Sequence, residues 1–349
     1  PEQNMNKVKA GDIQSTAVTV TWTPGIQADA IVCTPSAANS SAKTVTYTLT
    51  ATDISSGSAT VTGLEPETSY RATLKLGEKT RGYSTFTTNL DLRDAIQLTP
   101  TDDWVTAIQD AAAGSKFALA AGEYTLTSAK LQINNNVTIA AQNSGNLPVI
   151  NTCIHINNGS SLYLYQVVMD GTGTDGSQAI EYKTAGGFGD LIISGSEIRN
   201  YVKGLIYINV AAVANTIKIE NSIIHDIECS GGDFIDSRSG GWNNLIISSS
   251  TFYSCSAKRD ILRADDASSK VSASMITSID KCTFYNVGNG NANYRFFYLR
   301  FPGNTNTFTN NVVANFDNTR GFANSTSVGV PSYSNNYSYC LLYTSPSPR

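Results

Sequence analysis

The sequence has few charged residues. Asp, Glu, Lys and Arg make up 15% of the 349 residues, whereas about 25% is usual for a soluble domain. The net charge is −4, and a nucleic-acid protein would show a dominant basic balance instead. We therefore expect no nucleic-acid partner and a polar surface built largely from Asn, Ser and Thr, as in a turn-rich β protein.

Long apolar runs are also missing. No stretch of about 18 apolar residues occurs, so we expect no membrane-spanning helix. The chain opens at Pro1 rather than Met and shows no signal peptide, which indicates a processed or trimmed start. Residues 341–349 break the pattern that precedes them, and we interpret them as a non-native tail.

Metal and thiol motifs are scarce. Only His155 and His225 are present, and neither supports a metal site or a catalytic triad. None of the six cysteines has CxxC spacing, so a zinc ribbon or a thioredoxin-like site is unsupported. Cys229, Cys255 and Cys282 follow one another at similar intervals. Because free cysteine is among the most buried residue types, core thiols are favoured over disulfides.

Residues 1–90 contain short strands in which apolar and polar residues alternate. The segments AVTVTWTPG, KTVTYTLT, SATVTGL, SYRATLKL and YSTFTT have the spacing of a β-sandwich. Trp22 and the run GLEPETSY (63–70) resemble a fibronectin type III domain, with Tyr70 at the tyrosine-corner position. The resemblance implies a spacer or docking module, followed by a linker at 91–101.

The rest of the chain repeats. Apolar runs recur at intervals of 26, 28, 32 and 29 residues, and such a period indicates a solenoid whose neighbouring coils share one core. The units hold short strands with Asn, Ser and Gly at the turns, which predicts a parallel β-solenoid over 102–340. The equivalent positions are Ile198, Ile224, Phe252, Phe284 and Val313.

A short helix is predicted at the start of the solenoid. In TDDWVTAIQDAAAG, Thr101 or Asp102 can serve as the N-cap. Val105, Ile108 and Ala112 fall on one helical face. A helix that covers the open end of the core is what a solenoid needs for solubility.

A second set of segments places charge along one face. They are AIEYK (179–183), LIYIN, FIDSR, ILRAD, FFYLR and GFANS (321–325). Alternate strand residues point to opposite faces, so one set forms core and the other forms a charged and aromatic strip suited to an acidic polysaccharide. This strip consists of Glu181, Lys183, Tyr207, Asn209, Asp236, Arg238, Arg263, Asp265, Tyr298 and Arg300.

Part of the chain resembles the pectate lyases. The segments GGDFIDSRSGGWNNLIISSSTFYSCSAKRDILRADD (231–266) and YRFFYLRFPGNTNTFTNN (294–311) follow the order of motifs in that family. There, a D-x-x-x-D-I-K strand precedes a TISxNxF strand and a lysine, and an R-x-P-R-x-R-x-G run follows. Here the proline is absent. The resemblance implies a right-handed parallel β-helix in a secreted bacterial protein.

The resemblance also implies residue roles. Asp236 matches a calcium-binding aspartate, with Asp233 as a second candidate ligand, and Lys258 matches the substrate-binding lysine. Arg295 matches the arginine base and Arg300 its supporting arginine. Calcium would neutralise a uronate carboxylate, so that the adjacent proton can be removed and the linked sugar eliminated. Since lysine shifts its pKa more readily than arginine, Lys258 and Arg295 are both candidate bases.

The same residues allow a structural interpretation. Asp236 and Arg263 are 27 residues apart, as are Arg238 and Asp265. Each pair would stack across coils as an ion pair worth about 0.2–1 kcal/mol, and a paired aspartate is a poor calcium ligand. Asp233 would point away from Asp236, because the two are three residues apart. Hydrolysis, which needs two or three convergent carboxylates, is disfavoured.

Two functions follow from these patterns. The favoured one is an extracellular or periplasmic polysaccharide lyase that cleaves a uronate-containing glycan by β-elimination, with calcium as candidate cofactor. The alternative is a non-catalytic glycan-binding or adhesive β-helix at the cell surface. Both imply a monomer that binds an acidic polysaccharide. The expected substrate contacts are Tyr207, Asn209, Arg238, Arg263, Asp265 and Tyr298.

Overall fold

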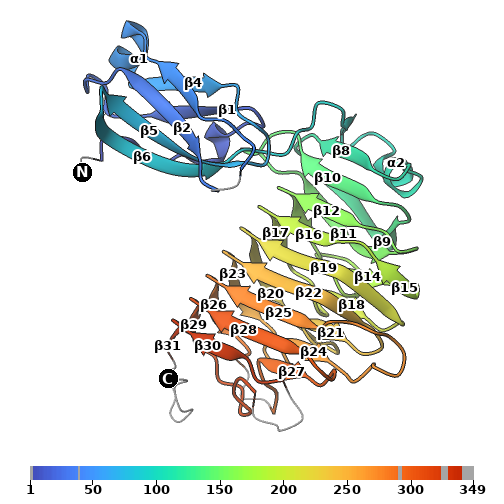
Figure 1. Ribbon diagram of the computed structural model, residues 1–349. Coiled ribbons are helices and arrows are strands. Elements are labelled where there is room, and N and C mark those ends of the chain that lie inside the picture. Colours follow the sequence, from blue (N-terminus) through green and yellow to red (C-terminus); the bar gives the residue numbers. More distant parts are fainter. Residues whose placement is uncertain (1–2, 38–39, 290–292, 324–328, 340–349) are drawn as a thin grey trace. The chain divides into compact units, whose positions relative to one another are not determined.

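The chain forms two compact units that consist mainly of β-strands (Figure 1). The first contains Pro1–Asp94 and Asn143–Asn146, and the second contains the remainder. No helix in the described part of the chain has the length and hydropathy needed to cross a membrane. The computed structural model describes residues 3–37, 40–289, 293–323 and 329–339.

The N-terminal unit contains two antiparallel sheets. Its elements are the 3-10 helix η1 (Ala10–Asp12), β1 (Ala17–Thr21), β2 (Ala30–Pro35), β3 (Val45–Thr48), α1 (Ala51–Ser56), β4 (Ser58–Thr62), β5 (Ser69–Leu76) and β6 (Lys79–Thr87). One sheet pairs β1 with β4, and the other has the strand order β3-β2-β5-β6. Trp22 and Tyr70 are buried in the core, and the Tyr70 hydroxyl accepts a hydrogen bond from the Glu65 backbone N–H (3.1 Å).

The helix α1 was not predicted from the sequence. Thr50 caps it by accepting a hydrogen bond from the Asp53 N–H, and Asp53 accepts one from the Thr50 N–H in return. Gly57 ends the helix in the left-handed conformation (φ 67°). These local signals sit between two alternating strands. The structure shows two small antiparallel sheets. This arrangement alone does not identify a fibronectin type III domain.

The second unit is a parallel β-solenoid, as predicted. Its first stack of strands is β14 (Ile180–Tyr182), β18 (Ile206–Ile208), β21 (Ile235–Ser237), β24 (Leu262–Ala264) and β27 (Phe297–Leu299). The second stack is β7 (Ile96–Leu98), β8 (Ser115–Leu119), β10 (Val137–Ala141), β12 (Leu162–Tyr165), β16 (Leu191–Ser194), β19 (Ala212–Glu220) with β15 (Gly186–Phe188) beside it, β22 (Gly241–Ser248), β25 (Ile276–Asp280), β28 (Thr305–Thr309) and β30 (Ser332–Ser334). The third stack is β13 (Val168–Asp170), β17 (Glu197–Arg199), β20 (Ile223–Ile227), β23 (Thr251–Cys255), β26 (Thr283–Val287), β29 (Val312–Ala314) and β31 (Tyr337–Tyr339).

One long strand joins the first and third stacks into a single sheet. Val149 of β11 (Val149–Ile156) pairs with the third stack at β13, whereas Ile154 pairs with the first stack at β14. The strand β9 (Glu123–Ile133) lies alongside β11 with a register shift. The first and third stacks therefore belong to one continuous sheet.

The backbone register confirms the repeat read from the sequence. Ile198, Ile224, Phe252, Phe284 and Val313 are direct neighbours in successive third-stack strands. All five are buried in one continuous core. The five cysteines among the described residues are also buried and free, as expected.

The predicted capping helix is present but shorter. The helix α2 (Trp104–Gln109) is capped by Asp103, which is later than either predicted N-cap. Ile108 is buried and Val105 is partly buried against the core, as predicted, whereas Ala112 lies beyond the end of the helix and is exposed, so the predicted apolar face is wrong at Ala112. Trp104 is buried instead and packs edge-on against Tyr124 at 5.7 Å. This aromatic contact decides which side of the helix faces the core.

A two-residue turn joins the second stack to the third in coil after coil. The first turn residue has a left-handed φ between 48° and 58°, which Asn and Gly tolerate better than most residues. The second points inward. The residues in first position are Gln166, Gly195, Asn221, Ser249, Lys281, Asn310 and Asn335.

The second turn residues form a hydrogen-bonded ladder inside the solenoid. The N–H of Ser196 donates to Oγ of Ser222 (3.2 Å), and the N–H of Ser222 donates to Oγ of Ser250 (3.1 Å). Further along, the N–H of Cys282 donates to Oδ1 of Asn311 (2.8 Å). Each coil thus satisfies a buried N–H of the coil before it, as buried polar groups require.

Replacing Ser250 with Ala should lower the free energy of unfolding by about 1–3 kcal/mol, because the buried N–H of Ser222 then lacks its acceptor. Ser249→Ala is the matched control. Ser249 is exposed in the same turn, and its loss should cost less than about 0.5 kcal/mol. Chemical denaturation compares the two variants, and equal stability would contradict the proposed role of the ladder.

Candidate functional site

The strip lies on the outward face of the first stack. The register puts one strip residue from each strand in a single column. The residues on either side of each are small or apolar and buried, as strand alternation predicts. This column is Glu181, Tyr207, Asp236, Arg263 and Tyr298.

Acidic and basic side chains of the strip pair within a coil. Arg238 donates from Nε to both carboxylate oxygens of Asp236, at 3.0 Å each. Arg263 donates from Nε and Nη2 to Asp265, at 2.9 and 3.1 Å. Residues i and i+2 share a strand face, and each arginine meets its own coil's carboxylate there. The expected ion pairs across coils, Asp236–Arg263 and Arg238–Asp265, do not form among the described residues, although Asp236 and Arg263 are register neighbours.

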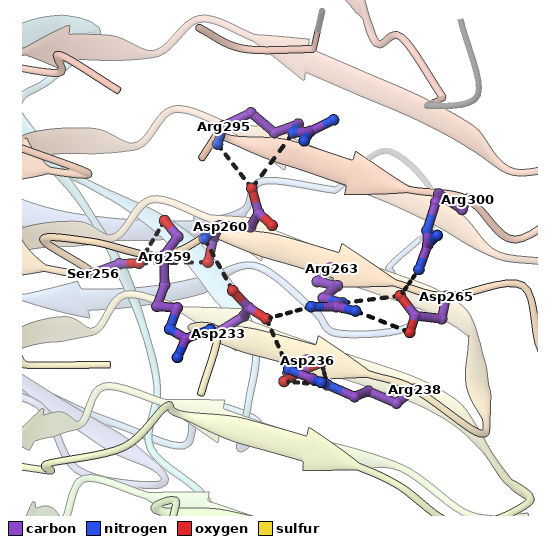
Figure 2. A network of polar contacts seen from close by, with 10 residues as sticks. All are labelled: Asp233, Asp236, Arg238, Ser256, Arg259, Asp260, Arg263, Asp265, Arg295 and Arg300. Carbon is purple, nitrogen blue, oxygen red and sulfur yellow. Dashed lines mark hydrogen bonds and ion pairs between the residues drawn. The ribbon is translucent and has the colours of Figure 1, made fainter. Parts of the chain in front are cut away.

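Asp233 links the two coils (Figure 2). Its fully buried carboxylate accepts hydrogen bonds from Nη2 of Arg238 (3.2 Å) and Nη1 of Arg263 (3.3 Å). It also accepts one from the backbone N–H of Asp260 (3.0 Å). The expectation that Asp233 and Asp236 diverge is wrong, since both contact Arg238. Asp233 precedes β21, so strand alternation does not govern its direction.

The two candidate calcium ligands already bind arginine. Asp233 and Asp236 are buried, and their oxygens accept the hydrogen bonds described above. Burial raises the pKa of Asp236, although the hydrogen bond from Arg238 acts in the opposite direction. Within the ranges that the structure describes, no group of three or more His, Cys, Asp or Glu side chains is arranged to hold a metal ion. This donor set does not fit calcium.

A buried pair that the sequence analysis missed lies beside Asp233. Oδ1 of Asp260 accepts a hydrogen bond from the backbone N–H of Arg295 (2.8 Å) and lies 3.6 Å from Nε of Arg295. Burial raises the pKa of Asp260 to about 6, against the hydrogen bond from Arg295. Asp233 and Asp260 are 27 residues apart, the spacing that relates Asp236 to its neighbour one coil on. That spacing could have identified Asp260.

Three guanidinium groups surround the ring of Tyr298. The Cζ atoms of Arg295, Arg300 and Arg263 lie 3.9, 4.7 and 5.6 Å from the ring centroid, which is within cation–π range. Arg295 is 3% exposed, and its guanidinium makes no hydrogen bond to the described residues. Burial lowers the pKa of Arg295, although the charge of Asp260 opposes this.

Lys183 of the strip is 41% exposed and pairs with Glu181, and the most exposed arginines of the strip are Arg238 and Arg300. Their side chains are 32% and 34% exposed. Nη2 of Arg300 donates to Oδ1 of Asp265 (2.5 Å). Burial alone would raise the pKa of Asp265, but the hydrogen bonds from Arg263 and Arg300 lower it. Because a guanidinium has five N–H groups, both exposed arginines keep donors for a ligand.

Three other predicted residues lie outside this network. Lys258 is exposed and makes no hydrogen bond or ion pair with the residues that the structure describes, so no polar contact joins it to Arg295. Tyr207 is half-buried, and burial followed by the charge of Asp236 raises its pKa. Asn209 is exposed.

The central column extends further than the sequence analysis proposed. Gln132 and His155 are register neighbours of Glu181 in the two preceding coils. Nε2 of Gln132 lies 3.3 Å from Nδ1 of His155, and Nε2 of His155 lies 3.5 Å from Glu181. His155 precedes Glu181 by 26 residues, the same interval that separates Glu181 from Tyr207, so the spacing of the repeat could have placed His155 in the column.

Comparison with known families identifies one match. A family model described as a domain of unknown function (DUF4957) matches residues 122–255. This region includes Asp233, Asp236 and Arg238 but ends before the other arginines of the network. No curated protein sequence matches the chain.

Two solved structures resemble the chain at a low level. One is a family 28 exopolygalacturonase from Yersinia enterocolitica, with 11% identity, coverage of 97% of this chain and 98% of that chain, and a TM-score of 0.28. The other is the catalytic domain of a GH87 α-1,3-glucanase variant in complex with nigerose, with 11% identity, coverage of 94% and 87%, and a TM-score of 0.32. Such values transfer no activity, and the assignment of a parallel β-solenoid rests on the strand pairing.

The Asp260 carboxylate should make the protein less stable as the pH rises through about 6. Its pKa in the folded state exceeds the ordinary value of 3.8, so the stabilisation present below that value is lost on ionisation. Between about pH 5 and 7.5 the loss should be about 1 kcal/mol. Asp260→Asn should reduce this loss by the same amount in chemical denaturation, and an identical pH dependence in both proteins would contradict the assignment.

Proposed function

We propose that the strip binds an acidic polysaccharide without cleaving it. The observation that carries this proposal is the pair of partly exposed arginines, Arg238 and Arg300, each anchored to a buried or half-buried aspartate. Guanidinium groups held in place lose little freedom on binding, and their planar fork of donors matches a carboxylate.

The charge distribution supports an anionic ligand at the C-terminal end of the strip. Residues 293–316 contain Arg295 and Arg300 but no Asp or Glu. Asp265 reaches Arg300 from the preceding coil, so it offsets only part of this charge. Tyr298 adds an aromatic ring beside these arginines.

Cleavage is less well supported by the geometry. A general base must come within hydrogen-bonding reach of the proton that it removes, and Arg295 is 3% exposed behind Tyr298. Lys258 has no polar contact with the network. Asp233 and Asp236 are engaged by arginines rather than free to polarise a uronate carboxylate.

A polysaccharide lyase is the second candidate. The lowered pKa of Arg295 is what a guanidinium base would need, and motion of Tyr298 would expose it. This candidate predicts unsaturated, ultraviolet-absorbing products from polygalacturonate or alginate. Steady absorbance during incubation of the wild-type protein, with binding still measurable, would leave binding as the function.

The proposal extends to the type of the N-terminal domain, the location of the protein and its oligomeric state. A fibronectin type III-like spacer fits the two N-terminal sheets and the hydrogen bond to the Tyr70 hydroxyl. A secreted, periplasmic or cell-surface location is proposed because that is where a polysaccharide ligand would be met. The protein is proposed to act as a monomer.

Arg300→Ala and Arg238→Ala should each weaken binding of polygalacturonate or alginate about tenfold, because a charge-assisted hydrogen bond contributes about 1.5–3 kcal/mol. Affinity should also fall with added salt. Arg93→Ala is the control, since Arg93 is exposed and lies outside the strip. Titration calorimetry measures all three variants, and unchanged affinity in both strip variants would overturn the proposal.

A further inference from the structure

A second outward face of the solenoid has a different chemistry from the strip. Two columns of outward residues run along the third stack from β20 to β31, and we call them the tyrosine face. The first column is Ile223, Thr251, Thr283, Val312 and Tyr337. The second column is His225, Tyr253, Tyr285, Ala314 and Tyr339.

Large apolar and aromatic side chains of this face are open to solvent. The exposed fractions are 46% for Ile223, 55% for Tyr285, 41% for Val312, 67% for Tyr337 and 57% for Tyr339. A contiguous apolar patch on a protein surface usually marks an interaction site. Four of them, Tyr285, Val312, Tyr337 and Tyr339, lie on the neighbouring strands β26, β29 and β31 and form one patch, whereas Ile223 lies on β20, beyond β23.

Charge is absent from most of the face. The strands β23, β26, β29 and β31 read TFYSC, TFYNV, VVA and YSY and contain no Asp, Glu, Lys, Arg or His. Charged groups end at β20, where His225 contacts Asp226 (2.6 Å) and Glu197 (3.0 Å). The His225 ring stacks on Tyr253 at 4.5 Å and forms the boundary. These four strands therefore offer no counter-charge to an acidic glycan, and Lys281, in the turn before β26, is paired with Asp280.

An ordered polar edge lies beside the tyrosines. Ser254, Asn286 and Asn315 follow the second column in successive coils, each with a left-handed φ between 53° and 57°. Their side chains are linked, because Nδ2 of Asn315 donates to Oδ1 of Asn286 (3.1 Å) and Nδ2 of Asn286 donates to Oγ of Ser254 (3.5 Å). This edge offers amide and hydroxyl groups at fixed positions along the solenoid.

We propose that the tyrosine face is a second carbohydrate-binding surface, specific for a neutral polysaccharide. Flat rings with a polar hydroxyl suit the apolar faces and hydroxyl groups of sugar rings, and the amide edge supplies further hydrogen bonds. The Tyr285, Tyr337 and Tyr339 rings make no ring contact with the described residues, so their faces are open. Successive strands lie about 4.8 Å apart, so the face contacts an extended chain repeatedly.

This surface is independent of the strip and of its proposed ligand. The strands β23, β26, β29 and β31 of the tyrosine face contain no charged residue, so binding there should depend little on salt, whereas binding to the arginines should be salt-sensitive. The two activities can therefore be separated in one protein. Failure of either proposal leaves the other testable.

Affinity electrophoresis of the full chain in gels containing hydroxyethylcellulose, laminarin or dextran tests the proposal. We expect retardation in at least one gel, and about tenfold weaker affinity for Tyr285→Ala and for Tyr337→Ala. Tyr83→Ala is the matched control, since Tyr83 is a 42% exposed tyrosine in the N-terminal unit. Arg300→Ala should keep its affinity for the neutral polymer.

Three results would overturn the proposal. The first is that Tyr285→Ala and Tyr337→Ala are both retarded as strongly as the wild-type protein. The second is no retardation by any neutral polymer together with concentration-dependent self-association that Tyr285→Ala abolishes, which would assign the face to a second copy of this chain. The third is a lack of both activities. Chemical denaturation of each variant checks that the exposed substitutions leave the fold intact.

Discussion

The hydrogen bond from one two-residue turn to the next is the interaction on which the solenoid depends. A left-handed residue such as Asn221 or Asn310 reverses the chain, and the next side chain turns inward to accept an N–H from the previous coil. Because the turn has the same length in each coil from Gln166 to Asn335, the strands on both sides stay in register. A slip of one residue would exchange inward and outward faces. Both candidate surfaces are columns only because this register holds.

Buried carboxylates fix the positions of the arginine side chains at the strip. Asp233, Asp236 and Asp260 are almost completely removed from solvent, which is costly unless each charge is paired and hydrogen-bonded. Arg238 and Arg263 supply that pairing for Asp233 and Asp236, and Arg295 lies beside Asp260. The consequence is a set of guanidinium groups with fixed positions. Such an arrangement favours recognition of an anionic ligand over chemistry that needs a free carboxylate.

The two faces divide the chemistry of one solenoid. At the strip, one network joins Arg238, Arg263, Arg295 and Arg300 to Asp233, Asp236, Asp260 and Asp265 (Figure 2). The tyrosine face has no charge beyond β20. Both surfaces repeat along the coils, since successive strands of each stack pair in parallel. A repetitive surface suits a polymer better than a small molecule, which fits a polysaccharide ligand for each face.

The sequence by itself determined the period of the solenoid, the equivalence of positions such as Ile224 and Phe252, and the outward column that contains Asp236 and Arg263. These follow from alternation within a strand and from constant spacing between coils. Both regularities can be recognised from the order of residues along the chain alone. The core thiols and the Asn- and Ser-rich turns were predictable for the same reason.

Only the tertiary structure decided the ion-pair partners and the buried acids. Arg238 could have paired along its own strand or across to Asp265, and the choice depends on the position of Asp233, which lies in a loop where alternation does not apply. The Asp260–Arg295 contact joins two loops of unequal length. The burial of these two side chains cannot be predicted from the spacing of the repeats. Likewise, the contact of Trp104 with Tyr124 selected the buried side of the capping helix. Side-chain packing between segments that are distant in the sequence decides these ion-pair partners and buried faces. The residue pattern along the chain carries no information on that packing.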